Sequence, residues 1–315
     1  MKKFLKQLAL YTILLSILVF SINRWYLFMD KSDDNWTNKF MSVPENIQIC
    51  NLGSSHGLYS FNYEDLENDF TCFNFALASQ SLSYDLRILQ QYQNHLAEGC
   101  IVFIPVSYFS FFGIDETEEA EFLSKNKQYY DFLPPGKIKA YDLSTHIFER
   151  FLPALTAYET LPAVLFGGRT SSNDEIWSRS AQTIDIPSDA AQAYARHLVN
   201  EKLDGEGKRI HNKEEIHALY QIIALCQEIG AVPILVTTPY LREYLDEVNT
   251  NVPDFAEDFY GIIDQVTAET KTPYCNEASS PDFIDRKDLF MNADHLNKEG
   301  ARLFTQKIVF NVSAD

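Results

Sequence analysis

The stretch Asn46–Gly57, NIQICNLGSSHG, decides the fold of this chain. Its first part, Asn46–Leu52, is a mainly apolar run without charge, and this pattern predicts a β-strand. The glycines, serines and histidine that follow predict a turn. Similar short apolar runs recur along the chain between amphipathic stretches. Continuous apolar strands that are separated by helices favour a parallel sheet covered on both faces.

The rest of the chain repeats this alternation of strands and helices. The other predicted strands are Phe70–Leu77, Ile101–Val106, Val232–Thr238 and Pro273–Asn276. The predicted helices are Ser83–Glu98, Glu214–Ile229, Phe255–Thr270 and Asn297–Val309. We therefore predict an α/β fold of three layers, α/β/α, around a five-stranded parallel sheet of the flavodoxin-like type. Residues from about 113 to 208 form an insertion that we expect to be mainly helical.

The N-terminus has the pattern of a membrane anchor. Three lysines precede the uncharged run Leu8–Ile22, and the aromatic group Trp25–Met29 suits the outer interface. We predict a signal anchor over residues 1–29, a linker over 30–44 and one domain over 45–315. A cleaved signal peptide has the same basic start, but no small-x-small cleavage site follows Phe20. A buried core helix is the third alternative. The positive-inside rule places the N-terminus in the cytoplasm and the C-terminal domain outside it.

The charge of the chain is uneven. It contains 26 Lys+Arg and 44 Asp+Glu; residues 1–29 hold four bases and no acid, so the rest holds 22 bases against 44 acids, a net charge of −22. This balance argues against nucleic-acid binding. The five cysteines contain no CxxC pair, and we expect neither a metal site nor a cofactor.

Polar residues follow the predicted strands at the edge where an open parallel sheet binds its ligands. They are Gly53, Ser54 and Ser55, Ser79 and Gln80, Ser107, and His295. This set contains a nucleophile, a base and small residues that present backbone N–H groups, which is the minimum for serine acyl transfer. Each part also has a simpler explanation, because the first segment can be an ordinary turn and His295 a solvated loop histidine.

These residues resemble the SGNH/GDSL hydrolase superfamily over roughly residues 46–110 and 210–310. Gly53–His56 matches the family's Gly-Asp-Ser block, which implies Ser55 as nucleophile. Asn292–His295 matches its Asp-x-x-His block, which implies His295 as base. The anchored form resembles the extracytoplasmic proteins that accompany membrane-bound O-acyltransferases in O-acetylation of exopolysaccharide or peptidoglycan and in D-alanylation of teichoic acid.

Two departures from the family pattern affect the predicted site. Asn292 stands where the family has Asp, and an amide cannot stabilise an imidazolium by its charge. Asp294 is the candidate replacement, although adjacent side chains usually diverge. In addition, Ser107 occupies the place of the family's Gly-x-Asn-Asp block. The oxyanion or substrate contacts are therefore expected from the Ser55 backbone N–H and from Gly53, Ser79, Gln80 and Ser107.

The resemblance implies a bacterial extracytoplasmic serine acyltransferase or esterase that acts on a cell-envelope polysaccharide through an acyl-serine intermediate. The implied partners are a membrane-bound O-acyltransferase, a glycan acceptor and, through the N-terminal helix, the membrane. A strongly acidic domain favours a neutral glycan. Because of Asn292, the alternative is a catalytically weak accessory or binding subunit of such an acyltransferase system.

Overall fold

A computed structural model describes residues 1–29, 36–112, 125–156, 161–167, 173–198 and 209–313. The chain divides into two compact units. The first consists of residues Met1–Met41 and Leu123–Ile176, and the second of Ser42–Phe122 and Trp177–Asp315. The sheet and all the candidate site residues lie in the second unit.

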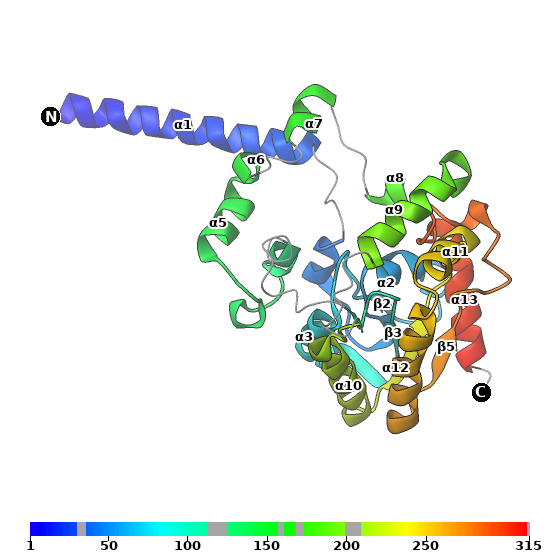
Figure 1. Ribbon diagram of the computed structural model, residues 1–315. Helices are drawn as coiled ribbons and strands as arrows, with labels where there is room; N and C mark the ends of the chain where they lie inside the picture. Colours follow the sequence, from blue (N-terminus) through cyan, green and yellow to red (C-terminus); the bar gives the residue numbers. More distant parts are fainter. Residues whose placement is uncertain (30–35, 113–124, 157–160, 168–172, 199–208, 314–315) are drawn as a thin grey trace. The chain divides into compact units, whose positions relative to one another are not determined.

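The second unit is built on a parallel sheet with the strand order β2-β1-β3-β4-β5. The strands are β1 (Ile47–Asn51), β2 (Cys72–Asn74), β3 (Leu96–Pro105), β4 (Val232–Thr237) and β5 (Tyr274–Asn276). This is the flavodoxin-like order, so the predicted α/β fold is confirmed (Figure 1). The order reverses between β1 and β3, and the segments after these two strands lie at the switch point where such sheets bind ligands.

Helices cover both faces of the sheet (Figure 1). One group contains α3 (Leu82–Tyr92), α10 (Lys213–Glu228) and α12 (Phe255–Thr270), with α10 in contact with the other two. A second group pairs α2 (Ser55–Ser60) with α13 (Lys298–Ser313). Right-handed crossovers place these groups on opposite faces, which gives the three layers. A further pair, α9 (Ile186–Leu198) and α11 (Arg242–Asn251), packs together, and the short η6 (Lys287–Leu289) precedes α13.

Helix α10 shows how local sequence sets the ends of these elements. The Asn212 side chain accepts hydrogen bonds from the backbone N–H groups of Glu214 and Glu215, as an N-cap residue does. At the other end Gly230 has φ +74°, and the N–H of Ala231 reaches back to the carbonyl of Cys226. This Schellman end explains why a glycine follows the helix.

Two predicted boundaries differ from the structure. The helix expected over Ser83–Glu98 ends at Tyr92, and after the short η2 (Gln93–His95) strand β3 already begins at Leu96. Gly99, expected to stop the helix, lies inside β3 with φ +74° and donates its N–H to the carbonyl of Gly230. Pairing of Leu96 with Ile47, followed by a register shift, extends the strand across this glycine. The strand expected over 70–77 is shorter, because only Cys72–Asn74 keeps regular pairing with β1.

The first unit is helical. It contains α1 (Lys2–Met29), α5 (Leu143–Phe151), α6 (Pro153–Thr156) and α7 (Leu161–Gly167), with short 3-10 turns η1 (Asn38–Ser42), η3 (Asn126–Tyr129) and η4 (Pro135–Lys137). Tyr26 of α1 forms an apolar cluster with Ala154 and Val164. In the predicted linker, of which residues 30–35 lie outside the described part, Phe40 stacks on Phe132 with 3.9 Å between ring centroids.

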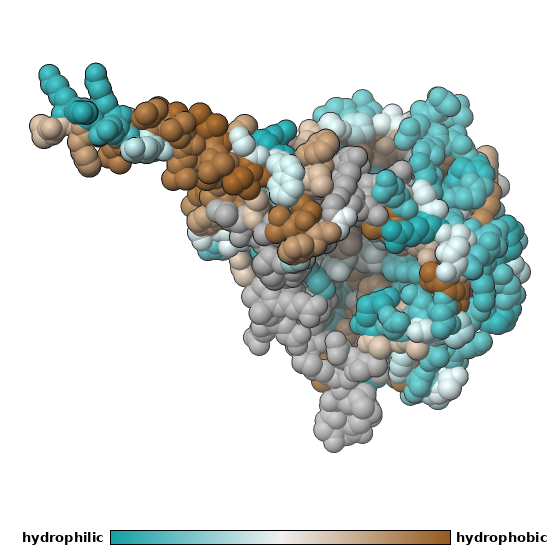
Figure 2. All heavy atoms as spheres, turned by 90° about the horizontal axis from the view of Figure 1, so that it is seen from above, coloured by the Kyte–Doolittle hydropathy of each residue, from teal (hydrophilic) through white to brown (hydrophobic). Residues whose placement is uncertain are grey.

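Lys2–Tyr26 is long and apolar enough to cross a membrane, by length and composition. Apart from Tyr26, most of its apolar side chains are exposed, unlike those of a core helix, as Figure 2 shows along α1. The predicted insertion, of which residues 113–124, 157–160, 168–172 and 199–208 lie outside the described part, is mainly helical. Beyond α5–α7 it contains α8 (Asn173–Trp177), η5 (Ala181–Thr183) and α9.

Candidate active site

Ser55 stands at the start of α2, immediately after the turn that leaves β1. Gly53 makes this turn with φ +115°, and a Cβ added there would lie 3.1 Å from Pro105. Ser54 is the N-cap of α2 and accepts a hydrogen bond from the His56 N–H. Strand, glycine turn and capped helix together present the half-buried Ser55 at the switch point of the sheet.

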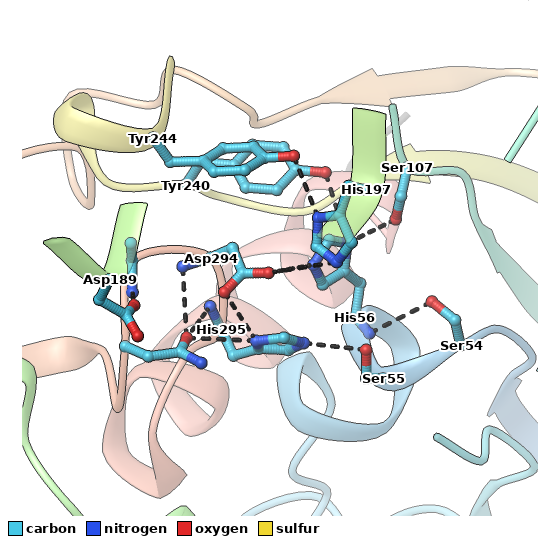
Figure 3. A network of polar contacts seen from close by, with 12 residues as sticks. Ser54, Ser55, His56, Ser107, Asp189, His197, Tyr240, Tyr244, Asp294 and His295 are labelled. Atoms are coloured by element: carbon cyan, nitrogen blue, oxygen red, sulfur yellow. Dashed lines mark hydrogen bonds and ion pairs between the residues drawn. The ribbon is translucent and has the colours of Figure 1, made fainter. Parts of the chain in front are cut away.

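His295 faces Ser55 from the segment before α13 (Figure 3). Its Nε2 lies 2.9 Å from Ser55 Oγ, which is hydrogen-bond distance for a general base and a nucleophile. The two residues are 240 positions apart in sequence. The parallel topology places both at the same edge of the sheet, and the segment between β5 and α13 carries His295 to Ser55.

Asp294 supplies the carboxylate that Asn292 lacks. Its Oδ1 lies 3.0 Å from His295 Nδ1, so the adjacent side chains converge where divergence was expected. Asn292 shapes the turn that allows this, because its side-chain oxygen accepts the backbone N–H groups of Asp294 (3.2 Å) and His295 (2.8 Å). The same oxygen lies 3.1 Å from His295 Nδ1, where it is a neutral second acceptor.

His56 forms a hydrogen bond with the other carboxylate oxygen of Asp294. Its Nε2 lies 3.4 Å from Asp294 Oδ2, and its Nδ1 lies 2.6 Å from Ser107 Oγ. An ionised carboxylate only accepts hydrogen bonds, so a neutral His56 donates from Nε2 and its Nδ1 accepts the Ser107 hydroxyl. His56 therefore positions Asp294.

The electrostatics of this cluster keep Asp294 charged and two nearby histidines, His56 and His197, neutral. Burial raises the pKa of Asp294, but the charge of His295 and hydrogen bonds from His295 and His56 outweigh it and hold the pKa well below its usual range. Burial lowers the pKa of His56, although the hydrogen bond to Asp294 opposes this. Burial likewise lowers the pKa of His197 to about 3. A single ionised carboxylate therefore lies beside the neutral imidazoles of His56 and His197.

Helix α9 contributes residues that the sequence did not point to. His197 Nε2 lies 3.7 Å from Asp294 Oδ2, and its Nδ1 lies 3.2 Å from the Tyr244 hydroxyl. Asp189 lies about two turns before His197 in α9. It accepts the N–H of Ala293 at 2.7 Å and so fixes the segment that carries Asp294 (Figure 3). The sequence did contain one indication that this helix reaches the site. The insertion leaves the sheet after β3, at the edge where such sheets bind ligands.

Some of the predicted oxyanion donors already have hydrogen-bond acceptors in the structure. The N–H of Gly53 donates to Asp85 Oδ1 at 2.8 Å, and the N–H of Ser107 donates to Ser110 Oγ at 2.9 Å, so neither is free for an oxyanion. The Gln80 amide donates to Asp85 Oδ1 at 2.6 Å and supports that same turn. Within the described part of the chain, the backbone N–H groups of Ser55 and of the exposed Ser79 donate no hydrogen bond.

Ligand atoms of His56, Asp294 and His295 also lie within 4.8 Å of one another, the spacing of a potential metal site. Both carboxylate oxygens already accept an imidazole N–H in this cluster. A metal ion would have to displace these hydrogen bonds and separate His295 from its acid. The donor set therefore fits a hydrogen-bonded triad better than a metal centre.

Gly57 holds α2 close to the end of β1, so substitution there should disturb the position of Ser55. A Cβ on Gly57 would lie 2.3 Å from the carbonyl oxygen of Leu52. We expect Gly57→Ala to cost about 1–3 kcal/mol of stability and, by displacing Ser55, about 10²-fold in activity. Thermal unfolding and ester turnover measure the two effects. Gly261→Ala is the matched control, because its Cβ would meet open space; an equal loss in both variants would contradict the prediction.

No protein-family model and no curated protein matches this chain. Among solved structures, the chain aligns with an acetyl xylan esterase at 12% identity and a TM-score of 0.39, over 84% of this chain and 100% of that one. It aligns with a putative acylhydrolase from Bacteroides fragilis at 8% identity and a TM-score of 0.39, over 90% and 99%. A putative SGNH hydrolase from Slackia heliotrinireducens aligns at 11% identity and a TM-score of 0.40, over 84% and 97%.

Proposed function

We propose that this protein transfers or hydrolyses acyl esters through an acyl intermediate on Ser55. The observation that carries the proposal is the ordered chain of hydrogen bonds from Ser55 Oγ to His295 (2.9 Å) and from His295 to Asp294 (3.0 Å). Nucleophile, base and acid in this order make up the serine-triad geometry that recurs on unrelated folds. Only the nucleophile is appreciably accessible, since Asp294 is 1% exposed and His295 is 9% exposed.

The hydrogen bonds define how protons move in the proposed reaction. His295 donates its Nδ1–H to Asp294, which leaves Nε2 to take the Ser55 proton as Oγ attacks the ester carbonyl. The resulting imidazolium returns that proton to the leaving alkoxide, and the acyl group stays on Ser55. His295 then removes a proton from a sugar hydroxyl or from water, whose oxygen attacks the acyl carbon and releases Ser55 with its proton restored.

The developing oxyanion needs hydrogen-bond donors beside Ser55. The backbone N–H of Ser55 is the first candidate, because it stands at the start of α2 without an acceptor in the described part of the chain. The backbone N–H of Ser79 is the second, and φ +55° places this residue in an exposed turn after β2. The other predicted donors have structural roles in this proposal. The turn before Ser55 is supported by Gly53 and Gln80, and His56 is held by Ser107.

Helix α1 supports a membrane-anchored location, with the domain over 45–315 extracytoplasmic. An uncleaved anchor is favoured over a cleaved signal peptide by packing within the first unit. Asn23 Oδ1 accepts the N–H of Ala154 at 2.9 Å, and Tyr26 packs on Ala154 and Val164. Removal of residues 1–29 would leave these partners uncovered.

The acceptor proposed for the acyl group is a hydroxyl of a neutral cell-envelope glycan. Residues 30–315 carry 22 bases and 44 acids, a net charge of −22, which disfavours a polyanionic acceptor. The proposed source of the acyl group is a membrane-bound O-acyltransferase, on the resemblance described above. Hydrolysis by an esterase uses the same site, with water as acceptor.

Labelling with a serine-directed fluorophosphonate tests the chemistry. We expect the full-length protein to form one covalent adduct on Ser55, and Ser55→Ala and His295→Ala to lose it. Ser54→Gly is the control, because glycine replaces a serine N-cap at a cost of only about a few tenths of a kcal/mol. If the protein is folded and Ser55 stays unlabelled, the proposed enzymatic activity is wrong. The alternative function, an accessory or binding subunit, which Asn292 suggested, would then be favoured.

A further inference from the structure

Helix α5 presents an apolar face without a partner in the described part of the chain. Its exposed apolar residues, between 47% and 66% exposed, are Leu143, Ile147, Phe148 and Phe151. At 100° per residue they fall within an arc of about 140°. On the opposite side Glu149 pairs with Lys127. At the margin of the apolar arc, about 20° from Leu143, Arg150 pairs with Asp131. This is an amphipathic helix whose polar side is occupied and whose apolar side is not.

Helix α7 adds a second exposed apolar surface in the same unit. Its Val164 is buried against Tyr26, while the next two residues, Leu165 and Phe166, are 54% and 90% exposed. A phenylalanine that is almost fully exposed beside a packed position is unfavourable in water. Both α5 and α7 therefore expose apolar side chains that need a cover.

These helices are fixed to one end of α1. The N–H of Ala154, at the start of α6, donates to Asn23 Oδ1, and α5 leads directly into α6 through Leu152. Tyr26 packs on both α6 and α7. The two exposed apolar surfaces are thus attached to the stretch Asn23–Met29, the C-terminal end of the candidate span.

Membrane dimensions place this stretch at the outer interface. A hydrocarbon core of about 30 Å needs about 20 helical residues, so a span that begins after Lys6 reaches Tyr26. Trp25 and Tyr26 are the aromatic types found at that depth. Helices packed against Asn23 and Tyr26 therefore lie at the boundary between acyl chains and headgroups.

We propose that α5 and α7 form a membrane-surface element that lies in the outer lipid interface. The apolar residues of α5 and Leu165 and Phe166 of α7 enter the acyl boundary, and the polar side of α5 faces water. Lipid is the occupant because both helices are held at the end of the span, α7 by direct contact with α1 and α5 through α6. The proposal rests on the proposed anchorage by α1, and the experiment below separates the two.

Fluorescent labels on paired positions test this element. The full-length protein is placed in phosphatidylcholine vesicles with single cysteines carrying an NBD label, on a Cys72→Ser, Cys275→Ser background in which the other three cysteines are buried. Ile147→Cys probes the apolar side of α5. Thr145→Cys is the matched control, because residues two positions apart on a helix point about 200° away from each other. Leu14→Cys reports on the span itself.

The Ile147 label should be blue-shifted and quenched by lipids that carry a nitroxide near the headgroup, whereas the Thr145 label should be quenched by iodide in water. The Leu14 label should respond to a nitroxide deep in the acyl chains. Iodide quenching of the Ile147 label while the Leu14 label remains in lipid would overturn the surface element alone. An Ile147 label shielded from both quenchers would indicate a protein partner and would also overturn it. A Leu14 label outside the lipid would overturn the anchorage.

Discussion

Asp294→Asn is expected to lower kcat by about 10⁴-fold, as the corresponding change does in chymotrypsin-type enzymes. The amide keeps the shape of the side chain but has no charge to stabilise the imidazolium of His295. It can also turn its NH₂ toward His295 Nδ1, which then holds the wrong tautomer, with the proton on Nε2 facing Ser55. The variant should therefore lose activity, while the buried segment keeps most of its packing contacts.

Turnover of an activated acetyl ester and thermal unfolding measure the effect of Asp294→Asn. The informative companion is the double variant Asn292→Asp/Asp294→Asn. It moves the carboxylate to the family's usual position, 3.1 Å from His295 Nδ1 in the present side chain. We expect this exchange to recover part of the lost activity. Wild-type turnover in the single variant would show that the Asp294 carboxylate takes no part in the reaction.

That Ser55 and His295 lie at the same edge of the sheet was predictable, because it depends on the parallel topology. Parallel strands deliver their carboxyl ends to one edge, so a serine after the first strand and a histidine after the last lie at that same edge. The structure joins Ser55 and His295 in this way across 240 residues. Residue types at strand ends carried this prediction, and the exact length of each strand did not matter.

The contact of Asp294 with His295 and the groups that support it were not predictable, because they depend on side-chain directions in irregular segments. Whether Asp294 turns toward His295 is decided by the turn that Asn292 caps and by Asp189, which holds the N–H of Ala293. His197 comes from an insertion outside the family resemblance. No periodicity describes such a segment, so the sequence named Asp294 as the candidate acid but could not show that its side chain reaches His295.

Gly99 shows the same limit in secondary structure. A glycine after an amphipathic run predicts a helix end, and the identical residue inside a strand permits a bulge. Pairing between Leu96 and Ile47, a tertiary interaction, selects the second outcome. Gly230, by contrast, ends α10, because there the local hydrogen bonds of the helix end decide the conformation.

A second large effect is expected at Asp85, which supports the turn before Ser55. The side chain is 1% exposed, and its Oδ1 accepts hydrogen bonds from the Gly53 N–H and the Gln80 amide. Burial raises the pKa of Asp85 to about 7, although these two hydrogen bonds oppose the shift. In the unfolded chain the same carboxyl has its usual pKa of 3.8.

The folded protein therefore keeps a proton on Asp85 between pH 3.8 and about 7 that the unfolded chain has lost. The free energy of unfolding falls as pH rises through this window, by up to about 4 kcal/mol, and the contribution is constant above it. Asp85→Asn is neutral at every pH, and its amide oxygen can accept both hydrogen bonds. It should become more stable than the wild type by about 4 kcal/mol on going from pH 4 to pH 8.

Denaturant unfolding of the detergent-solubilised chain at a series of pH values measures this difference. Asp246→Asn is the control, because Asp246 is exposed and its variant should follow the wild-type pH profile. The activity of Asp85→Asn should persist, since Gly53 keeps its acceptor and Ser55 its position. Parallel stability profiles for Asp85→Asn and the wild type would show that the buried carboxyl ionises as readily in the folded protein as in the unfolded chain. In that case the turn before the nucleophile would be held by a carboxylate, at a desolvation cost that the surrounding hydrogen bonds fully offset.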